Sequence, residues 1–153
     1  MYLPMNAELI APRGMNCGLC AGHQALRHKV KDKGIRISYC PGCRPRDKSW
    51  AFLKKKCRKL SKNKVQFCHE CKDFPCERLQ HLDKRYRTFF HMSMVDNLVF
   101  IKKNGMAKFL KAQKKKWKCP KCGDTVCCHN GICFGCNLSM LKKRKKIYRW
   151  KDD

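Results

Sequence analysis

Five Cys-x-x-Cys pairs constrain what this chain can fold into more than any other feature of its sequence. They lie at Cys17/Cys20, Cys40/Cys43, Cys68/Cys71, Cys119/Cys122 and Cys133/Cys136. Two thiolates separated by two residues in a tight turn can bind one ion, and a second such pair completes a tetrahedral zinc site. We therefore expect bound metal, rather than a large apolar core, to hold the fold together.

The length and the first residues of the chain favour metal over disulfides. A chain of 153 residues forms one ordinary domain or two small ones, and each structural zinc can add about 10 to 16 kcal/mol of folding free energy. The 14 cysteines could instead form disulfides. However, residues 1–12 lack the basic start and apolar stretch of a signal peptide, so we expect a reducing, cytoplasmic location. No run of residues reaches membrane-spanning length.

The cysteines divide into a C-terminal set of four and an N-terminal set of eight. The C-terminal set has zinc-ribbon spacing and is formed by Cys119, Cys122, Cys133 and Cys136. The N-terminal set could fill two further sites, although the sequence leaves the pairing open: Cys17, Cys20, Cys40, Cys43, Cys57, Cys68, Cys71 and Cys76. With four ligands per ion, the chain is predicted to bind about three zinc ions.

Other metal and thiol chemistries remain open as alternatives. An iron–sulfur cluster is the main one, since Cys68, Cys71 and Cys76 are closely spaced, although their spacing matches neither common ferredoxin pattern. Cys127, Cys128 and His129 lie inside the ribbon and could substitute for a ligand or remain free. A zinc hydrolase is disfavoured because four-cysteine sites leave no position for water and no His-Glu-x-x-His motif occurs.

Between and after the cysteines, the pattern predicts a small metal-stabilised α+β fold in four parts. Residues 1–80 form a cysteine-knuckle, metal-binding region, and 81–116 form a basic helical region. Residues 117–138 form the zinc ribbon, with a short hairpin between its knuckles, and 139–153 form a basic tail with aromatic residues. A tail of this composition can remain disordered until it meets a partner.

Apolar spacing and capping residues predict individual helices. Ser49 can cap a helix whose apolar stripe includes Trp50, Leu53, Cys57 and Leu60. Ser93 with Asp96 resembles a capping box, which begins a helix that ends at Asn104-Gly105. A second helix is expected to follow from Met106.

The charge of the chain points to a polyanionic partner. Lysine and arginine total 37 against 11 acidic residues, for a formal net charge of +26. Three zinc–thiolate sites would lower this charge by roughly six and leave it strongly positive. The residues expected to contact phosphates, or to stack on unpaired bases, are Lys108, Lys111, Lys114, Lys115, Lys116, Trp117, Lys142, Lys143, Arg144, Lys145, Lys146, Tyr148, Arg149 and Trp150.

Several motifs together resemble a cysteine-rich family of archaea and bacteria, domain of unknown function 3795. The resemblance rests on the runs 9–14 and 17–20, on Cys40-x-x-Cys43, on Cys57, and above all on 67–79, with Cys-His-Glu-Cys followed by Phe-Pro-Cys-Glu-Arg. The ribbon 117–123 looks like a tail found on longer members. The resemblance implies zinc binding through these cysteines and no established activity. This chain has Arg13 where the family pattern usually starts with a cysteine.

These observations lead to two functional hypotheses. The first is a zinc-binding, non-catalytic cytoplasmic protein that binds structured RNA, with the ribosome as a candidate partner. The alternative is an iron–sulfur or metal-handling accessory protein that docks on an acidic protein. The sequence indicates no membrane partner and no small-molecule substrate, and it leaves the oligomeric state open.

Overall fold

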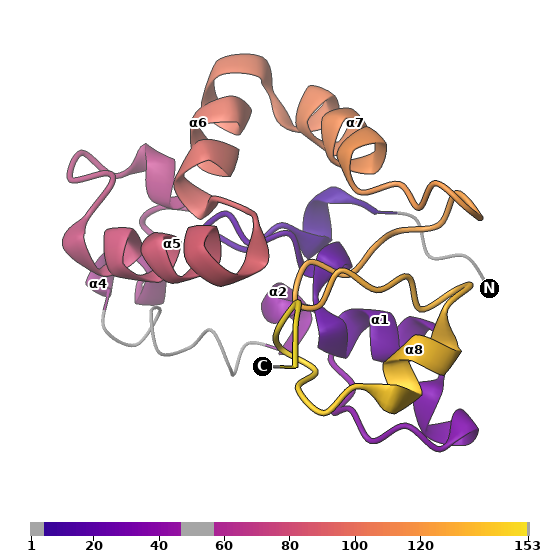
Figure 1. The fold of residues 1–153 in the computed structure, drawn as a ribbon. Helices are drawn as coiled ribbons and strands as arrows, with labels where there is room; N and C mark the ends of the chain where they lie inside the picture. The colour runs from indigo at the N-terminus through magenta and orange to yellow at the C-terminus, as the bar shows by residue number, and fades with distance from the viewer. Residues whose placement is uncertain (1–4, 47–56, 153) are drawn as a thin grey trace.

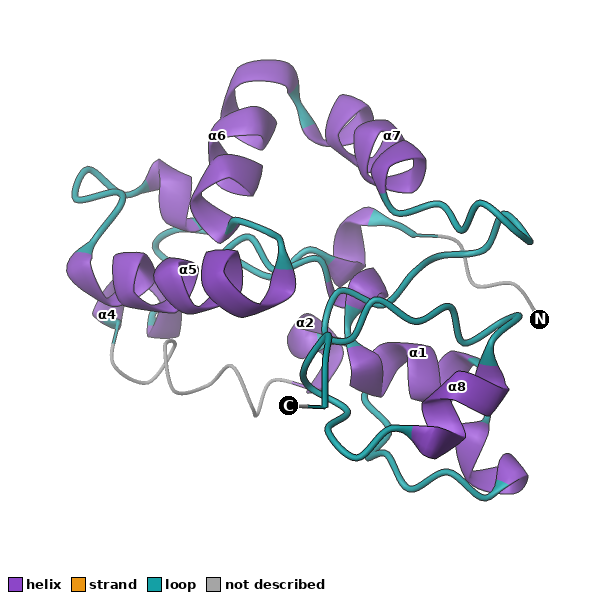
Figure 2. Ribbon diagram, in the orientation of Figure 1, coloured by secondary structure: helices purple, strands orange, loops and turns teal. Residues whose placement is uncertain are grey.

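The fold is built from short helices joined by long loops (Figures 1 and 2). We describe a computed structural model of the chain, which places residues 5–46 and 57–152. The α-helices are α1 (Ala21–Arg27), α2 (Cys43–Arg46), α4 (Arg58–Ser61), α5 (Glu77–Phe90), α6 (Met94–Asn104), α7 (Met106–Lys116) and α8 (Leu138–Lys143). Single 3-10 turns are η1 (Ala7–Leu9), η2 (Cys17–Leu19), η3 (Val30–Lys33) and η4 (Cys68–Glu70).

The described part of the chain contains no sheet, so the β part of the α+β prediction is wrong. Pairing between extended segments is limited to three isolated bridges, Ile10–Asn16, Lys118–Thr125 and Val126–Cys133. The loop between the C-terminal cysteine pairs does not become a regular hairpin because part of its backbone bonds elsewhere. For example, the Cys128 N–H donates to the carbonyl of Leu19, at 2.9 Å.

The helices predicted in the middle of the chain are confirmed. Ser93 caps α6, since its Oγ accepts a hydrogen bond from the Asp96 N–H at 3.0 Å. Gly105, with a φ of 89°, ends α6 and lets α7 begin at Met106. The helix predicted from Ser49 falls largely on residues 49–56, which lie outside the described residues, and α4 follows from Arg58.

One core joins segments that lie far apart in the sequence. Leu19, Leu79, Met94 and Leu98 have no exposed surface and pack in the same cluster as Cys128. The cluster therefore combines the first segment, the middle helices and the C-terminal loop. Cysteine-bearing loops and helices of this chain share one body of packed side chains.

The backbone passes close to α6 at Gly14. Its φ is 95°, and a Cβ placed on it would lie 2.4 Å from the carbonyl oxygen of Met94. Only glycine fits here without displacement. The side-chain amide of Asn97 donates to the Gly14 carbonyl at 2.9 Å, which fixes the same contact from the helix side.

The C-terminal tail is ordered in this structure, in contrast to the disorder that its composition allows. The Trp150 indole N–H donates to the Cys128 carbonyl at 2.9 Å, and the Asn130 amide donates to the Ile147 carbonyl at 3.0 Å. The Asp152 carboxylate accepts from the backbone N–H groups of residues 145 and 146. The tail is thus attached to the loop that carries Cys127 and Cys128.

None of the helices that the structure places combines the length and the hydropathy needed to cross a bilayer.

Candidate metal centre

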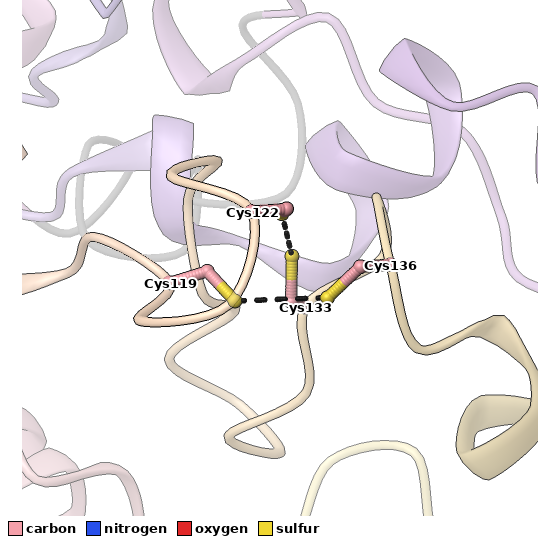
Figure 3. Close-up of side chains that lie close together, drawn as sticks. All are labelled: Cys119, Cys122, Cys133 and Cys136. Atoms are coloured by element: carbon pink, nitrogen blue, oxygen red, sulfur yellow. Dashed lines mark hydrogen bonds between the residues drawn. The ribbon is translucent and has the colours of Figure 1, made fainter.

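Four thiols converge in the loops between α7 and α8 (Figure 3). The Sγ atoms of Cys119, Cys122, Cys133 and Cys136 all lie within 4.8 Å of one another. The Cys119–Cys136 and Cys122–Cys133 sulfur pairs are 3.7 Å and 3.6 Å apart. A tetrahedral ion with metal–sulfur bonds of about 2.3 Å requires sulfurs about 3.8 Å apart. The four thiols can therefore hold one metal ion with little rearrangement.

Tight turns at both cysteine pairs direct backbone N–H groups at sulfur. In the first turn, the N–H groups of Cys122 and Lys121 lower the pKa of Cys119 to about 6. In the second, burial raises the pKa of Cys133 to about 12, although the N–H groups of Cys136 and Gly135 oppose this effect. A metal ion must displace the proton from such a buried thiol, so binding at neutral pH is expected to release protons.

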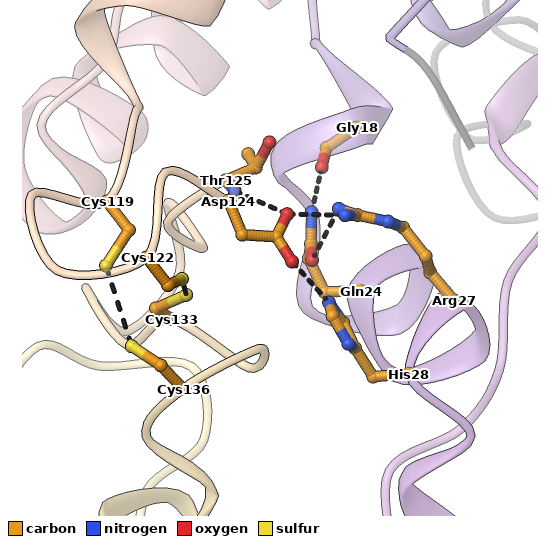
Figure 4. A network of polar contacts seen from close by, with 10 residues as sticks. All are labelled: Gly18, Gln24, Arg27, His28, Cys119, Cys122, Asp124, Thr125, Cys133 and Cys136. Atoms are coloured by element: carbon orange, nitrogen blue, oxygen red, sulfur yellow. Dashed lines mark hydrogen bonds and ion pairs between the residues drawn. The ribbon is translucent and has the colours of Figure 1, made fainter. Parts of the chain in front are cut away.

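An ion pair connects the first turn to α1 (Figure 4). Asp124 accepts hydrogen bonds from the Arg27 guanidinium and, at 2.7 Å, from the Thr125 N–H, and its other oxygen lies 3.4 Å from His28 Nε2. Burial opposes ionisation of Asp124, but Arg27 outweighs it, so the pKa of the carboxyl lies below its ordinary value. Asp124 also touches the second turn, since a Cβ on Gly135 would lie 2.7 Å from its Oδ2.

Cys127, Cys128 and His129 are buried and do not belong to the four-thiol group. The His129 Nδ1 accepts from the Ala21 N–H at 3.1 Å. Burial lowers the pKa of His129 to about 4, so the ring is neutral at pH 7 and can act as this acceptor. The three residues between the turns therefore join the centre to α1 and to the core, a role that no spacing in the sequence predicts.

Among the N-terminal cysteines, Cys17 and Cys43 lie together beside a buried arginine. The Cys43 N–H donates to the Cys17 sulfur at 3.3 Å, and an Arg13 Nη donates to the Cys43 sulfur at 3.3 Å. The hydrogen bond from Cys17, and then the charge of Arg13, lower the pKa of Cys43 to about 6. Arg13 stands where the family resemblance leads one to expect a cysteine, and here its guanidinium faces a thiol.

A second pair of N-terminal cysteines lies near these two. The Cys40 N–H donates to the Gly22 carbonyl at 3.1 Å, which brings the 40–43 turn against the start of α1. Burial raises the pKa of Cys20 to about 11, and the negative charges of Cys43 and Cys40 act in the same direction. Cys17, Cys20, Cys40 and Cys43 thus form one neighbourhood. The other four N-terminal cysteines line a cavity around α4 and the start of α5, and Cys43 packs against Leu60 in the wall of that cavity.

The lysines predicted to contact nucleic acid are exposed, whereas Trp117 is buried and Trp150 is half-buried. Trp117 is 6% exposed and packs in the core, which corrects its prediction as a stacking residue. Trp117 was predicted to lie on the surface because its neighbours in the sequence are lysines, but tertiary packing buries its side chain. Trp150 is half-buried, with its indole N–H bonded to Cys128, and the Arg144 guanidinium donates to backbone carbonyls of Arg149 and Asn130. Tyr148 is 45% exposed.

Comparison with known proteins supports the resemblance over one part of the chain. Residues 9–81 match the model of a family described as "Protein of unknown function (DUF3795)". No curated protein and no solved structure matches the chain. The matched segment contains all eight N-terminal cysteines, while the four-thiol centre and the lysines of α7 and α8 lie outside it. Fold and site together define a small, helical, cysteine-rich protein with a C-terminal centre that can hold a metal ion.

Proposed function

We propose that this is a zinc-stabilised, non-catalytic protein that binds structured RNA, with the ribosome as its expected partner. The observation that carries the proposal is the row of exposed lysines on α7, directly before the four-thiol centre: Lys108, Lys111, Lys114, Lys115 and Lys116. Phosphate contacts from such residues supply most of the affinity of proteins for nucleic acid.

Zinc is the metal that suits the C-terminal centre best. Sulfur pairs 3.6 and 3.7 Å apart match the edge of a tetrahedral zinc–thiolate site. With four protein ligands, the ion would have no position left for water, so its role would be structural. Such a site carries a net charge of about minus two, which leaves the surrounding lysines in large excess.

The shape of α7 separates a packing face from a basic face. Phe109 is 1% and Gln113 7% exposed, and the Gln113 Oε1 accepts from the Asn16 side chain at 3.1 Å. The lysines lie on the remaining faces. Within residues 5–46 and 57–152, no ion pair joins a lysine of α7 to an acidic side chain, so their charge is available to an external polyanion.

The segment around α8 would add a second basic surface. Lys142, Lys143, Lys145 and Lys146 are exposed, and Tyr148 offers an accessible ring for stacking. Residues 102–153 contain 16 basic and 3 acidic residues, and two of the acidic ones, Asp124 and Asp152, already hold Arg27 and the tail backbone. Figure 1 shows α7 and α8 at the two ends of the loops that carry the thiols.

A salt titration with charge-matched variants tests the proposal. Binding of the full chain to ribosomal RNA is measured between low and moderate salt, for the wild type and for Lys111→Gln/Lys114→Gln/Lys115→Gln. Each lost phosphate contact should lower the slope of log K against log salt by about 0.7 to 0.9, so a decrease of about 2 to 3 is expected. The control changes Lys33, Lys64 and Lys84 to Gln, which removes the same charge from other exposed positions. Equal effects of the two triple variants, or the absence of salt-sensitive binding, would refute the proposal.

A second variant examines the tail. Changing Lys142, Lys143 and Lys145 to Gln while keeping Arg144 spares the hydrogen bonds that Arg144 makes within the fold. Affinity and salt slope should fall while metal content and melting temperature stay unchanged. A matching loss of metal would assign these lysines a structural role. Competition with duplex DNA of equal length shows whether the surface prefers RNA.

A further inference from the structure

Four of the N-terminal cysteines line one small cavity far from the C-terminal centre in sequence. The cavity has a volume of about 30 Å³, and its thiol-bearing residues are Cys57, Cys68, Cys71 and Cys76. The remaining wall is mostly apolar and is formed by Leu60, Val65, Phe74, Leu79 and the stem of Lys59. These four cysteines are the ones that the neighbourhood of Cys17 and Cys43 does not include.

Short local elements bring the four cysteines to the wall of this cavity, although their sulfurs do not converge as closely as those of the C-terminal centre. Cys57 directly precedes α4, and Cys76 directly precedes α5. Cys68 opens the turn η4, which the Cys71 N–H closes by donating to the Cys68 carbonyl at 3.1 Å.

Two donors point at the sulfur of Cys71. The Lys59 ammonium lies 3.1 Å from this sulfur and 3.2 Å from an oxygen of Asp73, and the Asp73 N–H donates to the sulfur at 3.4 Å. A hydrogen bond from an outer donor orients a ligand sulfur for metal binding, and Lys59 is placed to supply it to Cys71. The same combination of a Cys-x-x-Cys turn and backbone N–H donors occurs at Cys119.

The cavity is large enough for a single ion. Its volume of about 30 Å³ exceeds the roughly 10–15 Å³ of probe space that one water molecule needs. A cation in such an apolar setting requires compensating charge, and four thiolates supply it. An open pocket of about 390 Å³, lined by the same four cysteines with Arg58 and Arg78, gives an entry path.

We propose that Cys57, Cys68, Cys71 and Cys76 together hold one Zn²⁺ ion in a second metal centre, with Lys59 as a positioning residue that donates a hydrogen bond to the Cys71 sulfur. The family resemblance implies zinc binding by these cysteines without a pairing, and this grouping assigns one. This second metal centre does not depend on RNA binding. If one of the two proposals is refuted, the other is unaffected.

Metal counting on single and double variants tests the grouping. The full chain is purified without oxygen, and zinc and iron are measured per chain for the wild type, Cys71→Ser, Cys76→Ser and the double variant. Each single variant should lose about one zinc equivalent, and the double variant should lose no more, because both ligands serve one ion. Combining Cys71→Ser with Cys119→Ser should lose about two. A double variant at Cys71 and Cys76 that loses two equivalents, or none, would overturn the grouping.

A measurement on the wild type covers the case in which the variants fail to fold. Zinc is withdrawn stepwise with a chelator, newly exposed thiols are alkylated, and each cysteine is followed by peptide mass spectrometry. Cys57, Cys68, Cys71 and Cys76 should be modified together as one set. Modification of Cys57 or Cys76 in step with Cys17 and Cys43 would contradict the assignment, and stoichiometric iron with sulfide would overturn the single-ion site.

Lys59→Met keeps the apolar stem of the side chain and removes the ammonium group. We expect this variant to retain its zinc at neutral pH but to lose it to a chelator at least several-fold faster, whereas Lys59→Arg should restore the wild-type rate. Lys62→Met, which changes an exposed lysine one turn away, is the matched control. Identical rates for Lys59→Met and Lys62→Met would remove Lys59 from the site.

Discussion

Gly14 illustrates how one residue fixes the relation between distant segments. Its φ is 95°, and a Cβ at this position would lie only 2.4 Å from the Met94 carbonyl oxygen, which leaves no room for a side chain. Gly14→Ala should lower the free energy of unfolding by about 2 to 5 kcal/mol, since a strained backbone and an overpacked contact add together. Urea titration of the metal-loaded chain measures this loss.

Gly34 provides the matched control for this substitution. It also has a positive φ, 82°, but nothing lies within 4 Å of its Cβ position. Gly34→Ala should therefore cost only about 1 kcal/mol, the backbone part of the effect. If both variants lost the same stability, the close approach of Gly14 to α6 would not be a feature of the folded protein.

Asp83 makes a pH-dependent contribution that can be isolated. It accepts from Ser93 Oγ at 2.8 Å, the Val95 N–H at 3.1 Å and the Arg87 Nε at 2.6 Å. Burial opposes its ionisation, but these partners outweigh burial and hold the pKa of Asp83 below its ordinary value. Its stabilisation is thus fully present above the unfolded-state pKa of about 3.9 and is lost as the pH falls through the lower folded-state value.

Asp83→Asn tests this contribution. At pH 7 the variant should be less stable than the wild type by about 1 to 3 kcal/mol, and the difference should shrink below about pH 4. The unfolding free energies of the two proteins are compared at each pH, so that acid-induced loss of metal affects both. A difference that stayed constant from pH 7 to pH 3 would show that the charge of Asp83 contributes nothing.

At the scale of single residues, the sequence shows which cysteines can act together as ligands better than it shows which side chains are buried. The cysteines of the C-terminal centre could be found from spacing alone, because the turn between paired cysteines is local. Trp117 could not be placed, since its burial depends on Leu79, Met94 and other residues distant in sequence. The same holds for Arg13, whose partner Cys43 follows 30 positions later.

At the scale of elements, α6 shows which local signals are sufficient. Its start depends on the Ser93 hydroxyl, which accepts from the Asp96 N–H and donates to Asp83. Ser93→Ala should cost about 1 to 2 kcal/mol through the lost cap and the weakened Asp83 network. Ser139→Ala, at an exposed position in α8, should change stability by less than about 0.5 kcal/mol.

The Ser93 result is checked by a double-mutant cycle with Asp83→Asn. Because Ser93 and Asp83 share a hydrogen bond, the two losses should not add. Fully additive losses would mean that the hydroxyl acts only as a helix cap.

Helices were predictable where caps, glycines and apolar spacing agree within about ten residues, as at α6 and α7. The hairpin expected between the C-terminal cysteine pairs was not, because groups in this loop bond to residues about a hundred positions earlier. The Cys128 N–H donates to the Leu19 carbonyl, and the His129 side chain accepts from the Ala21 N–H. Spacing within the ribbon contains no signal of those partners. The candidate ligands of such a loop can thus be predicted from the sequence, whereas the conformation of its backbone cannot.

At the scale of the whole molecule, direct contacts join the C-terminal centre to the N-terminal segment. Asp124 pairs with Arg27 of α1, and Cys128 packs in the core with Leu19. A structural zinc site can contribute about 10 to 16 kcal/mol, which equals or exceeds the total stability of a typical small domain. Removing the metal should therefore disturb α1 as well as the loops that hold the ion.

Hydrogen exchange tests this connection in the full chain. In Cys119→Ser/Cys122→Ser, which removes two ligands of the C-terminal centre, amides of 117–137 and of α1 should lose protection together by at least tenfold. Amides of α5, which meets these loops through side-chain contacts of Tyr86 and Phe90 with His129, should lose less. Protection of α1 equal to that of the wild type would mean that the N-terminal segment is stable without the centre, and that the packing through Leu19 and Arg27 contributes little to it. Joint loss would show that one metal ion stabilises both ends of the sequence, because the loop between its ligands forms part of the common core.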